Sequence, residues 1–164
     1  MTRYNYVYDV SNHASDWYFL NEGQSENGQN SAAAFIASVA AANASALLTV
    51  PTIGVVACAG GAWGPNCPTK APGFSVKKYG AQKATECTQG QPSWCDADAG
   101  NGVWVNGSDV VGNDLLDTSV PVNASFIVGW LRSLRAGLGG VALKAVALDN
   151  GGWAVVRNPD PWWR

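Results

Sequence analysis

The chain carries one pattern twice: a segment with helical periodicity that is followed at once by a short apolar run. Residues 31–44 precede the apolar run 46–56, and residues 123–140 precede the run 141–148. Residues 4–10 add a strand pattern at the start. The order strand, helix, strand, loops, helix, strand is typical of a parallel sheet or of part of a (β/α)8 barrel. We therefore predict an α/β fold, a partial (β/α)8 TIM barrel with parallel strands and long loops.

Each helical segment has one apolar stripe. The stripes consist of Phe35, Ile36 and Val39 in the first segment, and Phe126, Trp130 and Leu134 in the second. Trp130 is therefore expected in the core, and Asn30 or Ser31 is the expected N-cap of the first helix. The run 46–56 is apolar at both even and odd positions, which predicts a strand covered on both faces.

Residues 57–121 form a long segment without helical periodicity, in which Gly, Pro, Asn and Asp recur every few positions. It contains the four cysteines, Cys58, Cys67, Cys87 and Cys95. They lack CxxC spacing, and the chain has one histidine, so a zinc site is not expected. Three disulfide pairings are open, and we favour Cys58 with Cys67 and Cys87 with Cys95. Such disulfides predict a secreted protein, whereas four reduced thiols in a cytosolic protein are the alternative.

Charge and hydropathy exclude two classes of partner. The net charge is −2 and Lys and Arg form no cluster, so the electrostatic footprint of a nucleic-acid-binding protein is missing. The longest apolar stretch, 46–61, is broken by Pro51 and by glycines and is too short to span a bilayer. With 164 residues, 47% of them hydrophobic, the chain can bury the core of one domain.

Polar residues follow the predicted strands. In parallel α/β folds the carboxyl ends of the strands meet at one face, and that face carries the chemistry. Here it would collect Asp9, the loop after Val56, and Asp149 with Asn150. We expect these groups to lie close together.

Six blocks along the chain resemble glycoside hydrolase family 44, in the order and spacing of that family. They are "TRYNYVYDVSNHASDWYF", "LLTVPTIGVVA", "GFSVKKYGAQ", "DADAGNGVWVNG", "VGNDLLDTSVPVNASFIVGWL" and "VALDN". Members of this family are endoglucanases and xyloglucanases that cleave β-1,4-glucans. The resemblance implies that residues 1–150 form a partial glycoside-hydrolase barrel domain and that residues 151–164 form a tail outside the family pattern.

The resemblance also implies roles for individual residues. Asn150 matches the asparagine that holds the sugar 2-hydroxyl, and Trp17 matches a tryptophan that lines the sugar cleft. Asn12 begins the same block and is expected to bind substrate as well. In the family the last block continues as Asp-Asn-Glu-Pro, and the Glu is the general acid/base. Gly151 stands at that position here.

The implied reaction is hydrolysis with retention of configuration, which needs two carboxyl groups about 5–5.5 Å apart. The three glutamates, Glu22, Glu26 and Glu86, end no predicted strand. Asp149 and Asp9 are therefore the candidate catalytic pair. The alternative is a catalytically crippled fragment or a carbohydrate-binding module that keeps part of the sugar cleft.

Tryptophans in predicted loops are candidate sugar platforms, because indole faces stack on pyranose rings. They are Trp17, Trp63, Trp94 and Trp104, each of which has packing within the protein as its alternative role. The sole histidine, His13, fits a polar surface or supporting position.

No cofactor is required for the implied reaction. Asp96, Asp98 and Asp114 are weak candidates for a structural calcium site, although Gly100 and Gly107 occupy positions where an EF-hand needs ligands. A turn cluster that caps its own backbone is the alternative. A partial barrel also leaves apolar strand edges unpaired, so we expect self-association beside the polysaccharide partner.

Overall fold

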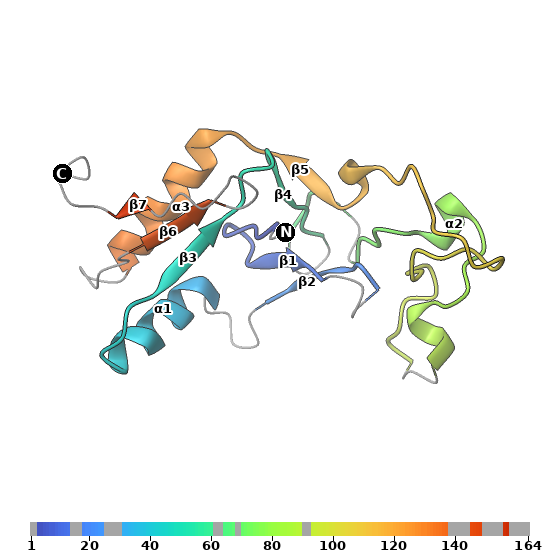
Figure 1. The fold of residues 1–164 in the computed structure, drawn as a ribbon, viewed down its shortest axis with the longest axis horizontal. Helices are drawn as coiled ribbons and strands as arrows, with labels where there is room; N and C mark the ends of the chain where they lie inside the picture. The colour runs from blue at the N-terminus through green and yellow to red at the C-terminus, as the bar shows by residue number, and fades with distance from the viewer. Residues whose placement is uncertain are drawn as a thin grey trace.

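The computed structural model describes residues 3–13, 18–24, 31–60, 64–67, 70–89, 93–137, 145–148 and 156–157. Its elements in chain order are β1 (Val10–Asn12), β2 (Asn21–Gly23), α1 (Ser31–Ala41), β3 (Leu47–Val50), β4 (Val55–Ala57), α2 (Val76–Tyr79), η3 (Glu86–Gln89), η4 (Leu115–Asp117), β5 (Ser119–Pro121), α3 (Ala124–Gly137), β6 (Ala145–Leu148) and β7 (Val156–Arg157). The molecule is elongated, with the strands β1, β2, β4 and β5 between a helical end and an end made mostly of loops (Figure 1).

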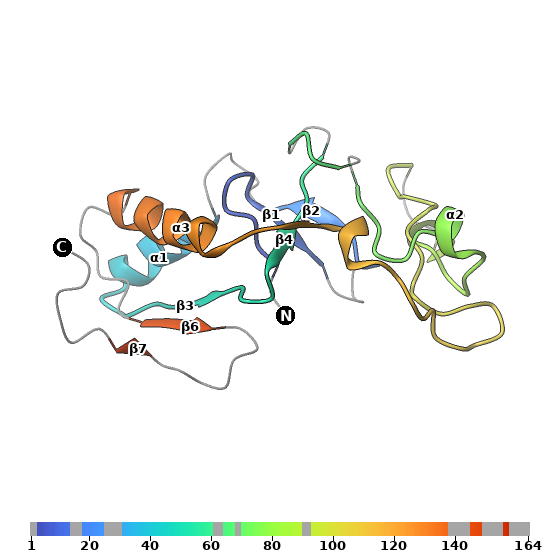
Figure 2. The ribbon, with the colours of Figure 1, turned by 90° about the horizontal axis from the view of Figure 1, so that it is seen from above.

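The helical end contains the parallel pair that the sequence predicts. β3 and β6 run parallel, in a register that pairs Leu47 with Ala145 and Val50 with Leu148. β7 pairs antiparallel with β6 on the other side. Helices α1 and α3 both lie on the same side of this sheet (Figure 2). The helix–strand alternation predicted for residues 31–148 is confirmed at this end of the molecule.

The main core lies between these helices and β3. Its buried side chains include Ile36 of α1, Leu48 and Val50 of β3, and Trp130 and Leu134 of α3. Trp130 is 1% exposed, which confirms its predicted place in the core. Among the helices that the structure describes, none is both long and apolar enough to cross a membrane.

The predicted stripe of α1 is wrong at one position. Phe35 is 54% exposed, although its neighbour Ile36 is 1% exposed. Successive residues of an α-helix are rotated by about 100°, so Phe35 points away from the sheet when Ile36 points toward it. The alanine-rich sequence around them leaves the rotation of the helix weakly specified.

The run 46–56 is two strands and not one. Pro51 and Gly54, whose φ is 78°, separate β3 from β4, which belongs to a different sheet. Within β3, Leu48 and Val50 are buried whereas Leu47 is 51% exposed. The prediction of a single strand covered on both faces is therefore wrong, because proline and glycine end the ladder and helices cover only one face.

The predicted strand over residues 4–10 is also wrong. Only a single bridge joins Asn5 to Val10, and a turn fills the space between them. The strand that follows, β1, pairs antiparallel with β2, and β4 pairs antiparallel with β5. Among the named strands of the described residues, β3 and β6 are the one parallel pair, and no closed barrel is formed.

The segment 57–121 is held together by cross-links and single hydrogen bonds more than by regular structure. Its two disulfides are Cys58–Cys67 and Cys87–Cys95, as the short spacings predict. The buried side chain of Gln82 donates to the carbonyl oxygen of Phe74 over 2.8 Å and accepts from the amide of Gly102 over 2.7 Å. These contacts tie the described parts of this segment to one another.

Candidate functional site

The carboxyl ends of β3 and β6 lie at the same edge of their sheet, because Val50 pairs with Leu148 in parallel register. Both strands point toward the central strands of the molecule (Figure 1). In sequence, Asp149 and Asn150 come directly after β6. These two residues, together with Trp17 and Trp63, lie outside the described residues, so their predicted roles stay predictions.

Asparagine side chains tie the central strands together. Asn21 is 2% exposed, and its amide nitrogen donates to the carbonyl oxygens of Thr118 over 2.6 Å and Cys58 over 3.1 Å. Asn12 donates to the Asn21 side-chain oxygen and to the carbonyl oxygen of Phe19, each over 2.9 Å. Both N–H groups of the Asn12 amide are thus used within the protein. A sugar hydroxyl that binds to Asn12 would therefore donate a hydrogen bond to the Oδ1 atom of Asn12.

Asp9 lies at the N-terminus of α1 and not at the end of a strand. Its Oδ1 atom accepts hydrogen bonds from the Ser31 amide over 3.1 Å, from the Ser31 hydroxyl over 2.7 Å and from the Tyr4 hydroxyl. Burial, and then the hydrogen bond to Asp9, raise the pKa of Tyr4 to about 12. Asp9 therefore caps a helix, which is a structural task that a catalytic carboxyl group would have to combine with chemistry.

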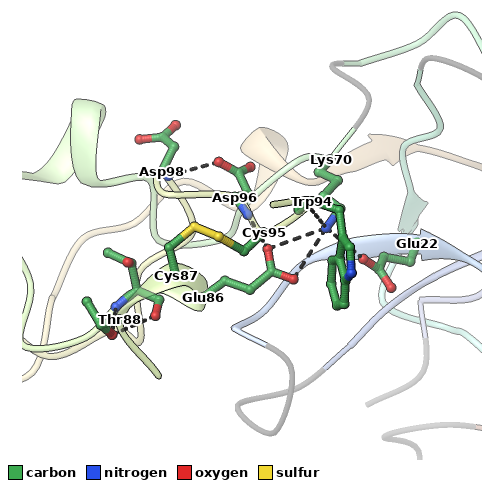
Figure 3. The surroundings of a disulfide bond; sticks show 10 residues. Glu22, Lys70, Glu86, Cys87, Thr88, Trp94, Cys95, Asp96 and Asp98 are labelled. Atoms are coloured by element: carbon green, nitrogen blue, oxygen red, sulfur yellow. Dashed lines mark hydrogen bonds and ion pairs between the residues drawn. A yellow bond between two sulfur atoms is a disulfide. The ribbon is translucent and has the colours of Figure 1, made fainter. Parts of the chain in front are cut away.

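A second group of charged residues surrounds Lys70, and we call Glu22, Lys70, Glu86 and Trp94 the Lys70 cluster (Figure 3). The Lys70 ammonium lies 3.5 Å from a carboxylate oxygen of Glu22 and 3.3 Å from one of Glu86. It also lies 5.1 Å from the centre of the Trp94 ring. Glu86 is 1% exposed, and its second oxygen accepts the amide N–H of Asp96 over 2.5 Å. The buried carboxylate is thus compensated by one ammonium group and one amide.

The three aspartates proposed for calcium are engaged in capping turns. Asp98 accepts from the Ser75 hydroxyl over 2.8 Å and from the Lys77 amide over 2.7 Å. Asp96 accepts from the amide of Asp98, and Asp114 accepts from the amide two residues further on. Within the described part of the chain, no group of three acidic, histidine or cysteine side chains is arranged to hold a metal ion.

The remaining candidates have supporting contacts. The Nε2 atom of His13 lies 3.1 Å from the side-chain nitrogen of Gln24. Trp104 is partly buried and donates its indole N–H to the carbonyl oxygen of Tyr79 over 3.2 Å. Both arrangements correspond to the structural alternatives that the sequence left open.

Sequence reasoning named Trp94 as a candidate sugar platform but missed the charged residues that surround it in the Lys70 cluster. Its members come from β2, from a loop and from the two sides of the Cys87–Cys95 disulfide, so no spacing along the chain connects them. The available signal was the short disulfide loop itself, which forces Glu86 and Asp96 together because they flank its two cysteines. No such rule identifies Lys70 as their partner.

The model of glycoside hydrolase family 44 matches residues 10–153. The chain belongs to glycoside hydrolase family 44. The family 44 chain is also similar to a solved structure described as that of CelM2, a bifunctional glucanase-xylanase protein from a metagenome library. That structure is 36% identical over 90% of this chain, with a TM-score of 0.73. The chain spans only 27% of the CelM2 chain. Among the curated proteins searched, none matches it.

Family membership, which six blocks of sequence indicated, is thus confirmed by both comparisons. The family match extends from the start of β1 past the end of β6, so it includes both main helices and the parallel pair. The helical end and the central strands therefore lie within the part of the chain that the family model matches.

Proposed function

We propose that this family 44 chain acts on β-1,4-glucans, as a retaining glycoside hydrolase of the endoglucanase or xyloglucanase type. The family match over residues 10–153 is the observation that carries the proposal. The similarity to a protein described as a glucanase-xylanase supports the same class of substrate. Asn150, Trp17, Asn12 and Trp63 are the proposed sugar contacts.

Hydrolysis with retention would use Asp149 and Asp9, one as acid/base and one as nucleophile. The second oxygen of Asp9, Oδ2, is buried and has no hydrogen-bond partner within the described part of the chain. Oδ2 is therefore the oxygen of Asp9 that would act as acid/base or nucleophile, because Oδ1 already accepts three hydrogen bonds at the start of α1.

A second function, glucan binding without cleavage, is favoured by one specific observation. Gly151 stands where the family pattern implies the acid/base glutamate. A missing general acid lowers the rate of hydrolysis by roughly 10² to 10⁴ for that role alone. Binding by apolar ring faces and amide groups does not need this carboxyl group.

The experiment that tests the proposal measures new reducing ends when the purified protein is incubated with xyloglucan and with carboxymethylcellulose. The proposal predicts cleavage that falls in Asp9→Asn and in Asp149→Asn and is kept in Asp109→Asn, a control at an exposed aspartate. Unchanged cleavage in both variants would remove this catalytic pair. Retarded migration in gels that contain either glucan, without cleavage, would establish the binding function. If the protein shows no cleavage and no retardation with either glucan, the assignment to β-glucans is overturned.

Location and assembly are further parts of the proposal. The two disulfides support export to an oxidising compartment.

In the described part of the chain, β3 has a sheet neighbour on one side only and exposes Leu47, which supports self-association through this edge. Light scattering should show assembly that increases with protein concentration and decreases in Leu47→Lys. A monomer at all concentrations would contradict the assembly.

A further inference from the structure

Trp94 is a large, half-exposed aromatic side chain next to a cross-link. It precedes Cys95 of the Cys87–Cys95 disulfide, and 53% of its surface is exposed. Exposing indole to water costs free energy in proportion to the apolar area that stays unburied. An exposed aromatic ring on a constrained loop is a common form of binding surface, since it offers contact area at a low cost in conformational entropy.

The Trp94 ring is held from within the protein. The Lys70 ammonium lies 5.1 Å from its centre and also donates to the Trp94 carbonyl oxygen over 3.4 Å. Lys70 is fixed in turn by the buried carboxylate of Glu86 (Figure 3). The position of the ring is therefore set when the protein folds, so a ligand does not have to immobilise it on binding.

Polar groups lie beside the ring. The side chains of Lys70 and Glu22 are 20% and 21% exposed, and together they offer an ammonium donor and a carboxylate acceptor. A pyranose ring presents C–H groups on its faces and hydroxyl groups around its rim. Apolar stacking on the indole, with hydroxyls bonded to an adjacent carboxylate and ammonium, matches both features of a sugar.

This surface lies away from Asn12, the one proposed sugar contact of the cleft that the structure describes. Asn12 and Asn21 are paired across the β1–β2 ribbon and share one of its faces. Glu22 follows Asn21 in β2, and successive residues of a strand point to opposite faces. The Lys70 cluster thus lies on the face of the ribbon opposite to Asn12.

We propose that Trp94, Lys70 and Glu22 form a second glucan-binding site, outside the cleft, on which a glucose ring of the polysaccharide stacks. The proposal rests on the proposed function for its ligand class. Its own content is the position of the site and the separation of that site from the cleft.

The test measures the affinity for soluble xyloglucan by electrophoresis in gels of increasing xyloglucan content. We expect Trp94→Ala to bind about tenfold more weakly, which corresponds to about 1.4 kcal/mol, and Trp94→Tyr to stay within about threefold of the wild type. Phe35→Ala is the matched control, because Phe35 is an aromatic residue with 54% exposure on α1, and it should bind as the wild type does.

Glu22→Ala supplies a second variant at a partly exposed position, and we expect it to bind about threefold more weakly. Unchanged affinity in Trp94→Ala, or in Glu22→Ala if the first variant does not fold, would overturn the second site and leave the proposed function intact. A wild-type protein that neither xyloglucan nor carboxymethylcellulose retards would overturn both. A Trp17→Ala variant separates the cleft from the second site. If the two sites are independent, the loss of binding free energy in Trp17→Ala should add to the loss in Trp94→Ala.

Discussion

Replacing Glu86 by alanine should destabilise the fold strongly, although Glu86 lies in a region with little regular structure. Glu86 is 1% exposed, and its carboxylate bonds both the Lys70 ammonium and the Asp96 amide. Breaking a buried ion pair from one side costs about 3–5 kcal/mol, and a buried amide without a partner costs about 1–3 kcal/mol. Lys70 keeps Glu22 as a partner, so we expect the lower end, about 3 kcal/mol in the free energy of unfolding.

The assay is urea unfolding of Glu86→Ala beside Glu22→Ala, with the disulfides intact. For a chain of this size, 3 kcal/mol corresponds to a fall in Tm of about 6–12 °C. Glu22→Ala should cost less than about 1 kcal/mol, because that side chain is 21% exposed and its ion pair is screened by solvent. A midpoint for Glu86→Ala that equals the midpoint for Glu22→Ala would refute the reasoning that burial of Glu86 decides its contribution.

Three further results are expected. Replacing Cys87 and Cys95 by serine opens a loop with a sequence separation of 8 and should cost about 2.5 kcal/mol in urea unfolding; no change in midpoint would contradict this. Folding favours the neutral form of Tyr4, because the pKa of Tyr4 is raised to about 12 from 10.0. The free energy of unfolding should therefore fall as the pH rises from 10 to 12, and it should fall less in Tyr4→Phe. Equal pH dependence of the unfolding midpoints of the wild type and Tyr4→Phe would refute this prediction. Trp130→Ala should lose about 3–5 kcal/mol, whereas Phe35→Ala should lose little, and similar thermal midpoints would show that the core is placed wrongly.

The helices and disulfides could be predicted because short-range patterns determine them. Amphipathic spacing places Trp130 in the core whatever the rest of the chain does. The pairs Cys58–Cys67 and Cys87–Cys95 close short loops, in which neighbouring cysteines meet without a long search. The parallel pairing of β3 with β6 followed from the helices that precede both strands.

The strands were predicted less well because their ends depend on contacts with distant residues. Asp9 has a positive φ of 52° and turns the chain so that its carboxyl group can cap α1. An apolar pattern over residues 4–10 does not encode that turn. After β3, the apolar pattern of the run 46–56 could not show that the chain passes into a second sheet beyond Pro51.

For the candidate site, the family motif names residues such as Asn150 and Trp17, which stay predictions because they lie outside the described residues. The Lys70 cluster depends on three segments that meet through folding, and neither Lys70 nor Glu22 has a distinctive neighbourhood in the sequence. Charged residues that pair over long distances in the chain leave no periodic signal. A structure is needed to find them.

Hydrogen–deuterium exchange with and without a xyloglucan oligosaccharide tests most directly whether this family 44 chain binds glucan at the ends of its strands. The account predicts slower exchange in peptides that cover residues 10–24 and 145–153, and in the disulfide loop that carries Trp94. Unchanged exchange throughout the chain, or protection confined to α1 and α3, would contradict it.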